Sequence, residues 1–246
     1  MKHIISFYFA LFSFASSFSQ EFELNDSTSF FPPKAYERID WFGKVEIDSM
    51  TLAYHSLYLA KFEEPILYRT ETKDEIFRFT WLRSFDKPMI FKLVIKESNQ
   101  ATLEIKEGNQ MQLATVTDLR KLRPNEIQKY NKYCKGELDY IQVENILKKV
   151  KITKPNYDFQ YQSEKMKFSQ ISLNEFRELF KKSNFSSLRS MECNLYGSDG
   201  AHWILEHLNS SFNYEFVYRW SPENNDFKDL CLYLISFGSL SKKEIY

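Results

Sequence analysis

The chain has 246 residues, with 33 acidic and 33 basic side chains, so its formal net charge is zero. A neutral chain lacks the excess of basic residues that bulk binding to nucleic acid or to an anionic membrane requires. Hydrophobic residues make up 43 % of the chain, which is enough apolar surface for a globular core. We therefore expect a folded protein that has no nucleic-acid partner.

The first residues have the three parts of a secretory signal peptide. A short basic region at 1–3 precedes the apolar run 4–14, and Ser17-Phe18-Ser19 is a small-x-small cleavage pattern. The apolar run is shorter than the ~20 residues that a membrane-spanning helix needs. We interpret 1–19 as a signal peptide that is cleaved before Gln20, which predicts an exported protein, periplasmic or extracellular, without a transmembrane segment in its mature part.

Three cysteines follow the predicted cleavage point, namely Cys134, Cys193 and Cys231. In an oxidising compartment they can form at most one internal disulfide, and their spacing does not select the pair. Cys231 lies on the apolar stripe of a predicted helix, so we expect it to be a small residue of the core.

The first part of the mature chain predicts a helix followed by strands. Asp48 or Ser49 can cap a helix that runs to about Phe62, and Pro65 ends this element. Apolar and polar residues then alternate in short runs, as in an antiparallel sheet with one buried and one solvated face. Phe77 is on the predicted buried face and Arg78 on the solvated one. The runs are 66–69, 76–83, 89–96, 101–106 and 112–117.

The middle of the chain changes in composition. Residues 119–161 are rich in Lys, Asn and Tyr, with helical patterns at 125–134 and 140–149, and we interpret them as an insertion. After it, Ser172 and Glu175 match a capping box, which predicts that a helix begins at Ser172.

The last part of the chain predicts a hairpin and a helix. Strands are expected at 202–208 and 214–220, with Glu206 opposite Glu215. This register places Trp203 and Trp220 on one face and Glu206 and Arg219 on the other, and we expect the aromatic face to be buried. Asp226 is the expected N-cap of a final helix that ends at a left-handed Gly238.

These elements together predict an α+β fold. It consists of a single domain over 20–246 with an antiparallel sheet of about six to eight strands, and two or three helices pack on one face of the sheet.

Four sequence runs resemble motifs of a loose set of uncharacterised exported bacterial proteins, similar to those of Bacteroidetes. The runs are Glu64-Pro65, FRFTWLRSF from Phe77, DGAHWILE from Asp199, and RWSP from Arg219. The resemblance covers about half of the mature chain and implies a common fold, but it carries no activity.

The candidate functional residues lie on the predicted solvated face of the sheet. Asp199, Glu206 and His202 are weak candidates for catalysis, and Arg78 and Arg219 are weak candidates for binding. Desolvated carboxylates near Arg and His can do acid–base chemistry. The structural alternative is that Glu206 and Arg219 form an exposed cross-strand ion pair, in which case Glu206→Gln would leave stability nearly unchanged.

The chain lacks the sequence signatures of common catalytic and metal sites. It has no HExxH, no paired CxxC, no glycine-rich phosphate loop and no GxSxG elbow, so we expect no metal and no cofactor. We therefore expect a non-enzymatic binding or interaction module whose partner is an unknown protein or small ligand of the cell envelope. The alternative is a hydrolase-like enzyme that uses Asp199, Glu206 and His202.

Overall fold

The computed structural model describes residues 29–32, 37–39, 45–47, 49–111, 116–117, 122–134, 138, 140–149, 151–152, 158–191 and 200–238. The predicted signal peptide at 1–19, Cys193 and Asp199 lie outside these ranges. The chain forms two compact units, one of which comprises Thr28–Gln110 and Phe159–Tyr246, while the other includes Met111–Asp158. No helix within the described ranges is long and apolar enough to cross a membrane.

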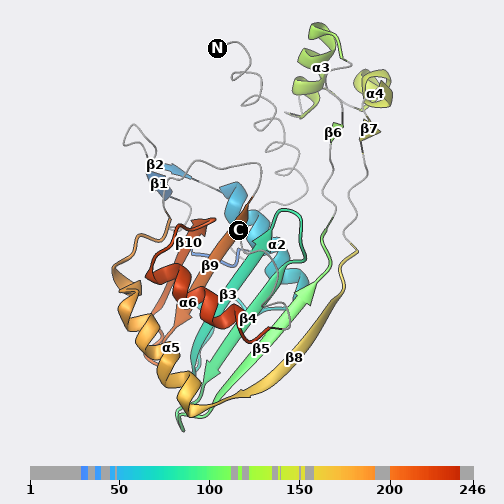
Figure 1. Ribbon diagram of the computed structural model, residues 1–246. Coiled ribbons are helices and arrows are strands. Elements are labelled where there is room, and N and C mark those ends of the chain that lie inside the picture. Colours follow the sequence, from blue (N-terminus) through green and yellow to red (C-terminus); the bar gives the residue numbers. More distant parts are fainter. Residues whose placement is uncertain are drawn as a thin grey trace. The chain divides into compact units, whose positions relative to one another are not determined.

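A six-stranded antiparallel sheet forms the centre of the larger unit (Figure 1). Its strand order is β10-β9-β3-β4-β5-β8, and every neighbouring pair is antiparallel. The predicted α+β fold with an antiparallel sheet is therefore confirmed. The strands are β3 (Glu75–Arg83), β4 (Met89–Ile95), β5 (Ala101–Gly108), β8 (Tyr161–Phe168), β9 (Ala201–Leu208) and β10 (Tyr214–Trp220).

Helices cover both faces of this sheet. Helices α5 (Gln170–Lys182) and α6 (Asp226–Ile235) pack on one face, which we call the α5–α6 face (Figure 1). Helix α2 (Ser49–Lys61) packs on the other, the α2 face, where its rings contact His202. Because side chains alternate along a strand, the α5–α6 helices cover one set of side chains and α2 covers part of the other. A small hairpin, β1 (Glu37–Ile39) with β2 (Val45–Ile47), also belongs to this unit.

The α5–α6 face contains the main hydrophobic core. Phe77, Phe91 and Trp203 are fully buried there, together with Cys231 of α6. The prediction that Cys231 is a core residue is therefore confirmed, and burial raises the pKa of its thiol well above the ordinary value. The three aromatic residues lie on the face that the alternation in the sequence predicts to be buried.

The register of the β9–β10 hairpin differs from the prediction by one residue. Glu206 lies opposite Phe216, and Trp203 lies opposite Arg219. The connection decides this register, because Asn209 accepts hydrogen bonds from the N–H groups of Ser211 and Asn213 through its side chain. Consequently Trp203 and Trp220 lie on opposite faces, and so do Glu206 and Arg219.

Burial of Arg219 is possible because backbone carbonyls satisfy its guanidinium. Its Nη1 donates to the carbonyl oxygens of Arg189 at 2.9 Å and Tyr218 at 2.7 Å. The guanidinium also lies over the Phe227 ring. The expectation that Arg219 lies on the solvated face together with Glu206 was therefore wrong.

Three predicted element ends differ from the structure. Helix α5 begins at Gln170, because Ser169 accepts a hydrogen bond from the Ser172 N–H and so caps the helix three residues earlier than predicted. Asn225, not Asp226, caps α6 in the same way. Gly238 has no positive φ, so no left-handed residue ends α6 there.

Two further elements differ as well. The predicted strand 66–69 is a short 3-10 helix, Leu67–Arg69, which buries Leu67 against Ile76 and Leu208. Strand β8 was not predicted, because most of its side chains are exposed and its sequence has little apolar alternation.

The smaller unit contains two helices and a short strand pair. Helices α3 (Pro124–Cys134) and α4 (Tyr140–Lys149) confirm the two helices predicted in this region. Strand β6 (Val116–Thr117) pairs with β7 (Lys151–Ile152). The segment 119–161 that we predicted as an insertion overlaps this unit.

Gly200 is expected to be necessary for the stability of the hairpin. Its φ is +156°, and a Cβ at this position would overlap Ser221 Oγ and the ring of Trp220. Gly200→Ala should therefore lower the free energy of unfolding by more than about 1 kcal/mol. Gly238→Ala is the matched control, because a Cβ there would meet nothing closer than 3.3 Å. Equal melting temperatures for the two variants would contradict this prediction.

Candidate functional site

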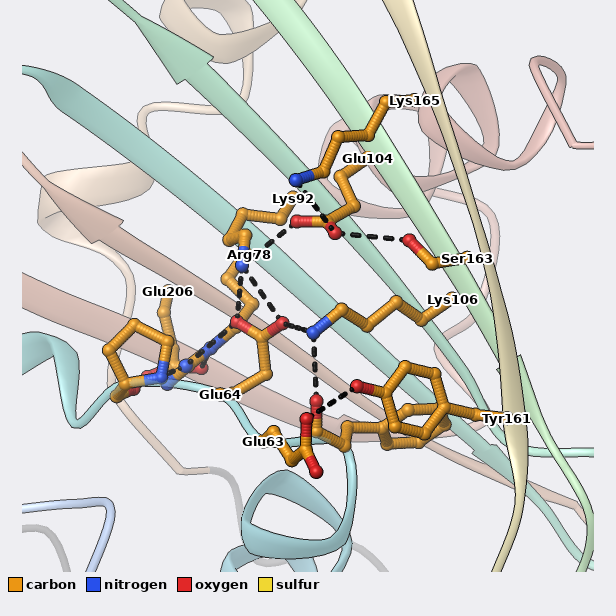
Figure 2. Close-up of polar contacts among 12 residues, drawn as sticks. Glu63, Glu64, Arg78, Lys92, Glu104, Lys106, Tyr161, Ser163, Lys165 and Glu206 are labelled. Atoms are coloured by element: carbon orange, nitrogen blue, oxygen red, sulfur yellow. Dashed lines mark hydrogen bonds and ion pairs between the residues drawn. The ribbon is translucent and has the colours of Figure 1, made fainter.

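Five charged residues lie in one row across the α2 face of the sheet. The strand pairing places Glu206 opposite Arg78, Arg78 opposite Lys92, Lys92 opposite Glu104, and Glu104 opposite Lys165. The row crosses β9, β3, β4, β5 and β8 in that order. We call these five residues the charge row, and Figure 2 shows them with their neighbours.

The closest pair in the charge row is Arg78 with Glu206, and both side chains are fully buried. Arg78 Nε donates to Glu206 Oε2 at 2.7 Å, and Nη2 donates to Oε1 at 2.7 Å. Tyr214 adds a third hydrogen bond, from its hydroxyl to Glu206 Oε1 at 2.9 Å. This bidentate geometry is the strongest form of an arginine–carboxylate contact.

The turn after α2 places a further carboxylate, that of Glu64, on the α2 face of the sheet. Glu63 has φ of +56°, and the Glu64 N–H donates to the Leu59 carbonyl, which together make a Schellman-type helix end. The left-handed residue turns the chain, and Pro65 prevents the helix from continuing. Glu64 is thereby directed into the sheet, where its side chain is fully buried.

Three cations from three adjacent strands surround the Glu64 carboxylate. Lys106 Nζ lies 2.7 Å from Oε1, Lys92 Nζ lies 2.9 and 3.0 Å from the two oxygens, and Arg78 Nη1 lies 3.5 Å from Oε2. The remaining donors of Lys106 and Arg78 meet backbone carbonyls at the end of α2, those of Phe62 and Pro65. The row then continues from Lys92 to Glu104 at 3.1 Å.

The electrostatic environment favours the charged forms of Glu64 and Arg78. Burial acts to raise the pKa of the Glu64 carboxyl, but the charges of Arg78 and Lys92 outweigh it and hold the pKa below its ordinary value. Burial acts to lower the pKa of Arg78, and the Glu206 carboxylate raises it above the ordinary value. Burial and Glu206 raise the pKa of Tyr214 well above its ordinary value, so the phenol remains a hydrogen-bond donor.

The network therefore satisfies its own polar groups. The α2 face was predicted to be solvated, and this was wrong, because Arg78 and Glu206 are both fully buried. Each oxygen of Glu206 already accepts a hydrogen bond from Arg78. Such a carboxylate can hold structural elements together, but a group that transfers a proton has to reach its substrate.

The other candidate residues lie apart from this pair. His202 is on the α2 face, four residues from Glu206 along β9, which is about 13 Å and too far for direct proton exchange. Arg219 is on the α5–α6 face, so the predicted Glu206–Arg219 ion pair does not form. Asp199 lies outside the described ranges. Of the four candidates that the structure describes, it brings only Arg78 and Glu206 together.

His202 belongs to a cluster of rings under α2. Its Nδ1 lies 3.1 Å from the Tyr218 hydroxyl, and its ring packs against Tyr54, His55 and Trp220. His55 is fully buried, and among the described residues neither of its ring nitrogens has a hydrogen-bond partner. Burial, and then the nearby His202, lower the pKa of His55 well below its ordinary value, so this imidazole is neutral.

His207 has a structural environment on the α5–α6 face. Its ring stacks on Phe77 with centroids 4.4 Å apart, and its nitrogens lie 2.9 Å from Glu215 and 3.1 Å from Glu75. Ser186 donates to the same Glu215 oxygen and not to the histidine. In a catalytic triad the hydroxyl bonds to the histidine and the histidine bonds to the acid, so Ser186, His207 and Glu215 do not form one.

The sequence analysis did not single out Lys92, Lys106, Glu104 and Tyr214, and it noted Glu64 only as part of a motif. The alternation of side chains along the strands contains a signal that these residues lie on a covered face. Large apolar residues such as Ile90 and Ile204 share the α2 face with these charges and are fully buried. Large apolar residues on a sheet face indicate that other elements cover this face. Charged residues on a covered face have to pair with one another.

Comparisons with known proteins give no relative from which a function could be inferred. No protein-family model, no curated protein and no solved structure matches the chain. Among the described residues, no group of three or more His, Cys, Asp or Glu side chains is placed to hold a metal ion.

Removal of either partner of the Arg78–Glu206 pair should destabilise the protein strongly. We expect Glu206→Gln to lower the free energy of unfolding by about 3 kcal/mol or more, because Arg78 then stays buried without its main counter-charge. This replaces the expectation of a nearly silent substitution.

A double-mutant cycle checks this prediction. Arg78→Met and Glu206→Leu should each be destabilising in urea titrations, while the double variant should lose clearly less than the sum of the two, because it leaves neither buried charge without its partner. Additive losses would show that the two groups do not stabilise each other.

His55 should make the protein sensitive to mild acid. Its pKa in the folded state is lowered below 6.5, so the unfolded chain binds the proton more readily, and stability decreases as the pH falls below about 6.5. The comparison of melting temperatures at about pH 7.5 and about pH 5.5 avoids the range in which Glu64 and Glu104 titrate. His55→Phe should reduce the difference between the two temperatures, and an unchanged difference would contradict this role of His55.

Proposed function

We propose that this chain is an exported, non-enzymatic binding module. The proposal of export rests on the basic, apolar and small-residue segments of 1–19. The proposal of binding without catalysis rests on one observation, the complete burial of Glu206 with both of its oxygens bonded to Arg78. The carboxylate and the cation that the sequence offers for chemistry hold the sheet together instead.

The hydrolase-like alternative has no supporting contact among the described residues. It would need Glu206 to exchange its bidentate partner for a substrate, which would leave Arg78 buried without its main counter-charge. It would also need His202 to act together with Glu206, although both lie on β9 with Ile204 between them on the same face. A module that binds through its surface needs neither change.

The experiment expresses the full chain with a C-terminal tag in its source cell. We expect the tagged protein in the envelope or the medium, with its N-terminus at or near Gln20, and together with a partner that binds the purified protein again in calorimetry. Ester, glycoside and peptide substrates should be turned over no faster by wild type than by His202→Gln. Recovery of intact Met1 in the cytoplasm would contradict export, and turnover that His202→Gln abolishes would favour the hydrolase.

A further inference from the structure

Strand β8 is a long and regular edge of the main sheet. It pairs with β5 without interruption from Gly108 opposite Tyr161 to Ala101 opposite Phe168. It has no proline, and its register has no bulge. In Figure 1 it is the outermost strand on its side of the sheet. These are the properties of an edge that can accept a further strand.

The hydrogen-bonding pattern shows which backbone groups of β8 point outward. The Asn109 N–H donates to the Gln160 carbonyl at 3.0 Å, and these two residues continue the β5–β8 register. Alternate residues of an antiparallel strand bond to the same neighbour. The even-numbered residues of β8 therefore bond to β5, whereas Tyr161, Ser163, Lys165 and Lys167 direct their N–H and C=O groups away from the sheet. Within the described ranges, no strand pairs with these outward groups.

The charge row ends at this edge with an excess of positive charge. The Lys165 side chain is 67 % exposed and lies 3.4 Å from Glu104, which it shares with Lys92. Lys167 is exposed on the same face. With Arg78, Lys92 and Lys106, Lys165 makes four cations that contact Glu64, Glu104 or Glu206, and Lys167 adds a fifth cation on this face. Glu63 is a further carboxylate at this edge, where it accepts a hydrogen bond from Tyr161. An acidic residue placed beside Lys165 would give this exposed cation a second carboxylate besides Glu104.

The other face of β8 provides an apolar contact at the same level. Met166 lies between Lys165 and Lys167 along the strand and points to the α5–α6 face, where it packs against the core. Phe168 on that face is buried. An added strand with an apolar residue opposite Met166 would extend this core by one strand.

We propose that β8 is the docking edge for an extended partner segment that alternates acidic and apolar residues. The segment adds a seventh strand to the sheet. Its backbone pairs with the outward N–H and C=O groups of Ser163, Lys165 and Lys167. Its acidic side chains lie beside Lys165 and Lys167, and an apolar side chain between them packs on Met166. This proposal rests on the proposed binding function and assigns to it a surface and a class of partner.

The charges of β8 disfavour pairing between two copies of the chain. In an antiparallel pair of β8 strands, the two registers that use most of the strand place Glu164 against Glu164 or Lys165 against Lys165. Like charges directly opposite each other destabilise a strand pair. Glu164 disfavours one register of self-association and Lys165 the other, while Lys165 and Lys167 favour an acidic segment, so charge gives specificity to this edge.

The test measures binding of a fluorescent probe peptide, acetyl-Ser-Glu-Leu-Glu-Val-Glu-Ser-amide, to the purified protein that begins at Gln20. We expect saturable binding that weakens with salt, and protection from hydrogen exchange at the amides of Ser163, Lys165 and Lys167. The charge-reversal variant Lys165→Glu/Lys167→Glu should bind the probe at least about tenfold more weakly. It should in turn prefer the peptide in which Lys replaces each Glu.

Two further variants separate the edge from general electrostatics. Lys96→Glu/Lys181→Glu makes the same change in net charge at two exposed positions outside the strands and should leave binding unchanged. Ser163→Pro removes one outward N–H without changing charge, and it should abolish binding while the melting temperature shows that the fold is retained.

Equal probe binding by wild type and the charge-reversal variant, or binding that Ser163→Pro does not affect, would overturn the proposal for β8. A partner recovered from the envelope by wild type and equally by Ser163→Pro would keep the binding function and place it on another surface. A chain without any partner and with His202-dependent turnover would instead reject the binding function itself.

Discussion

The burial of the Glu64 carboxylate is the constraint on which the main sheet depends. A carboxylate without access to water needs positive charge and hydrogen-bond donors on all sides. Here they come from Arg78, Lys92 and Lys106 on three neighbouring strands. The left-handed turn at Glu63 brings the carboxylate there, so the end of α2 and the register of three strands determine one another.

This network is better understood as a source of specificity than of stability. Replacement of buried ion pairs by apolar groups is often neutral or stabilising, whereas loss of one partner is costly. The charge row of this sheet needs every strand in one register, since a shift by one residue would move Arg78 and Lys92 to the other face. We therefore regard the network as the feature that selects this register among the alternatives that a strongly aromatic sequence would allow.

The two faces of the sheet both contain buried side chains, but these side chains differ in chemistry. The α5–α6 face is mainly apolar. Its buried polar side chains include Arg219 and His207, which are bonded to carbonyls or carboxylates. The α2 face combines charges with rings, and His55 has no hydrogen-bond partner there within the part of the chain that the structure describes. Since the buried charges of Glu64, Arg78 and Glu206 bond to one another, we expect a partner to be met at the surface. The edge at β8 is where the interior network reaches solvent.

The sequence by itself determined the local elements and the α+β class. The alternation that begins at Phe77 identified β3, β4 and β5, and the helical spacing of residues such as Cys231 identified α6, because these patterns depend only on the period of each structure. Tertiary structure decided the rest. Cover by α2 turned a predicted solvated face into an interior, and the Asn209 side chain selected the hairpin register. Pairing with β5 made an edge strand of 161–168, whose exposed side chains have no periodic signal. Glu64 and Glu206 meet Arg78 from 14 and 128 residues away, and local pattern contains no information about contacts at such separations.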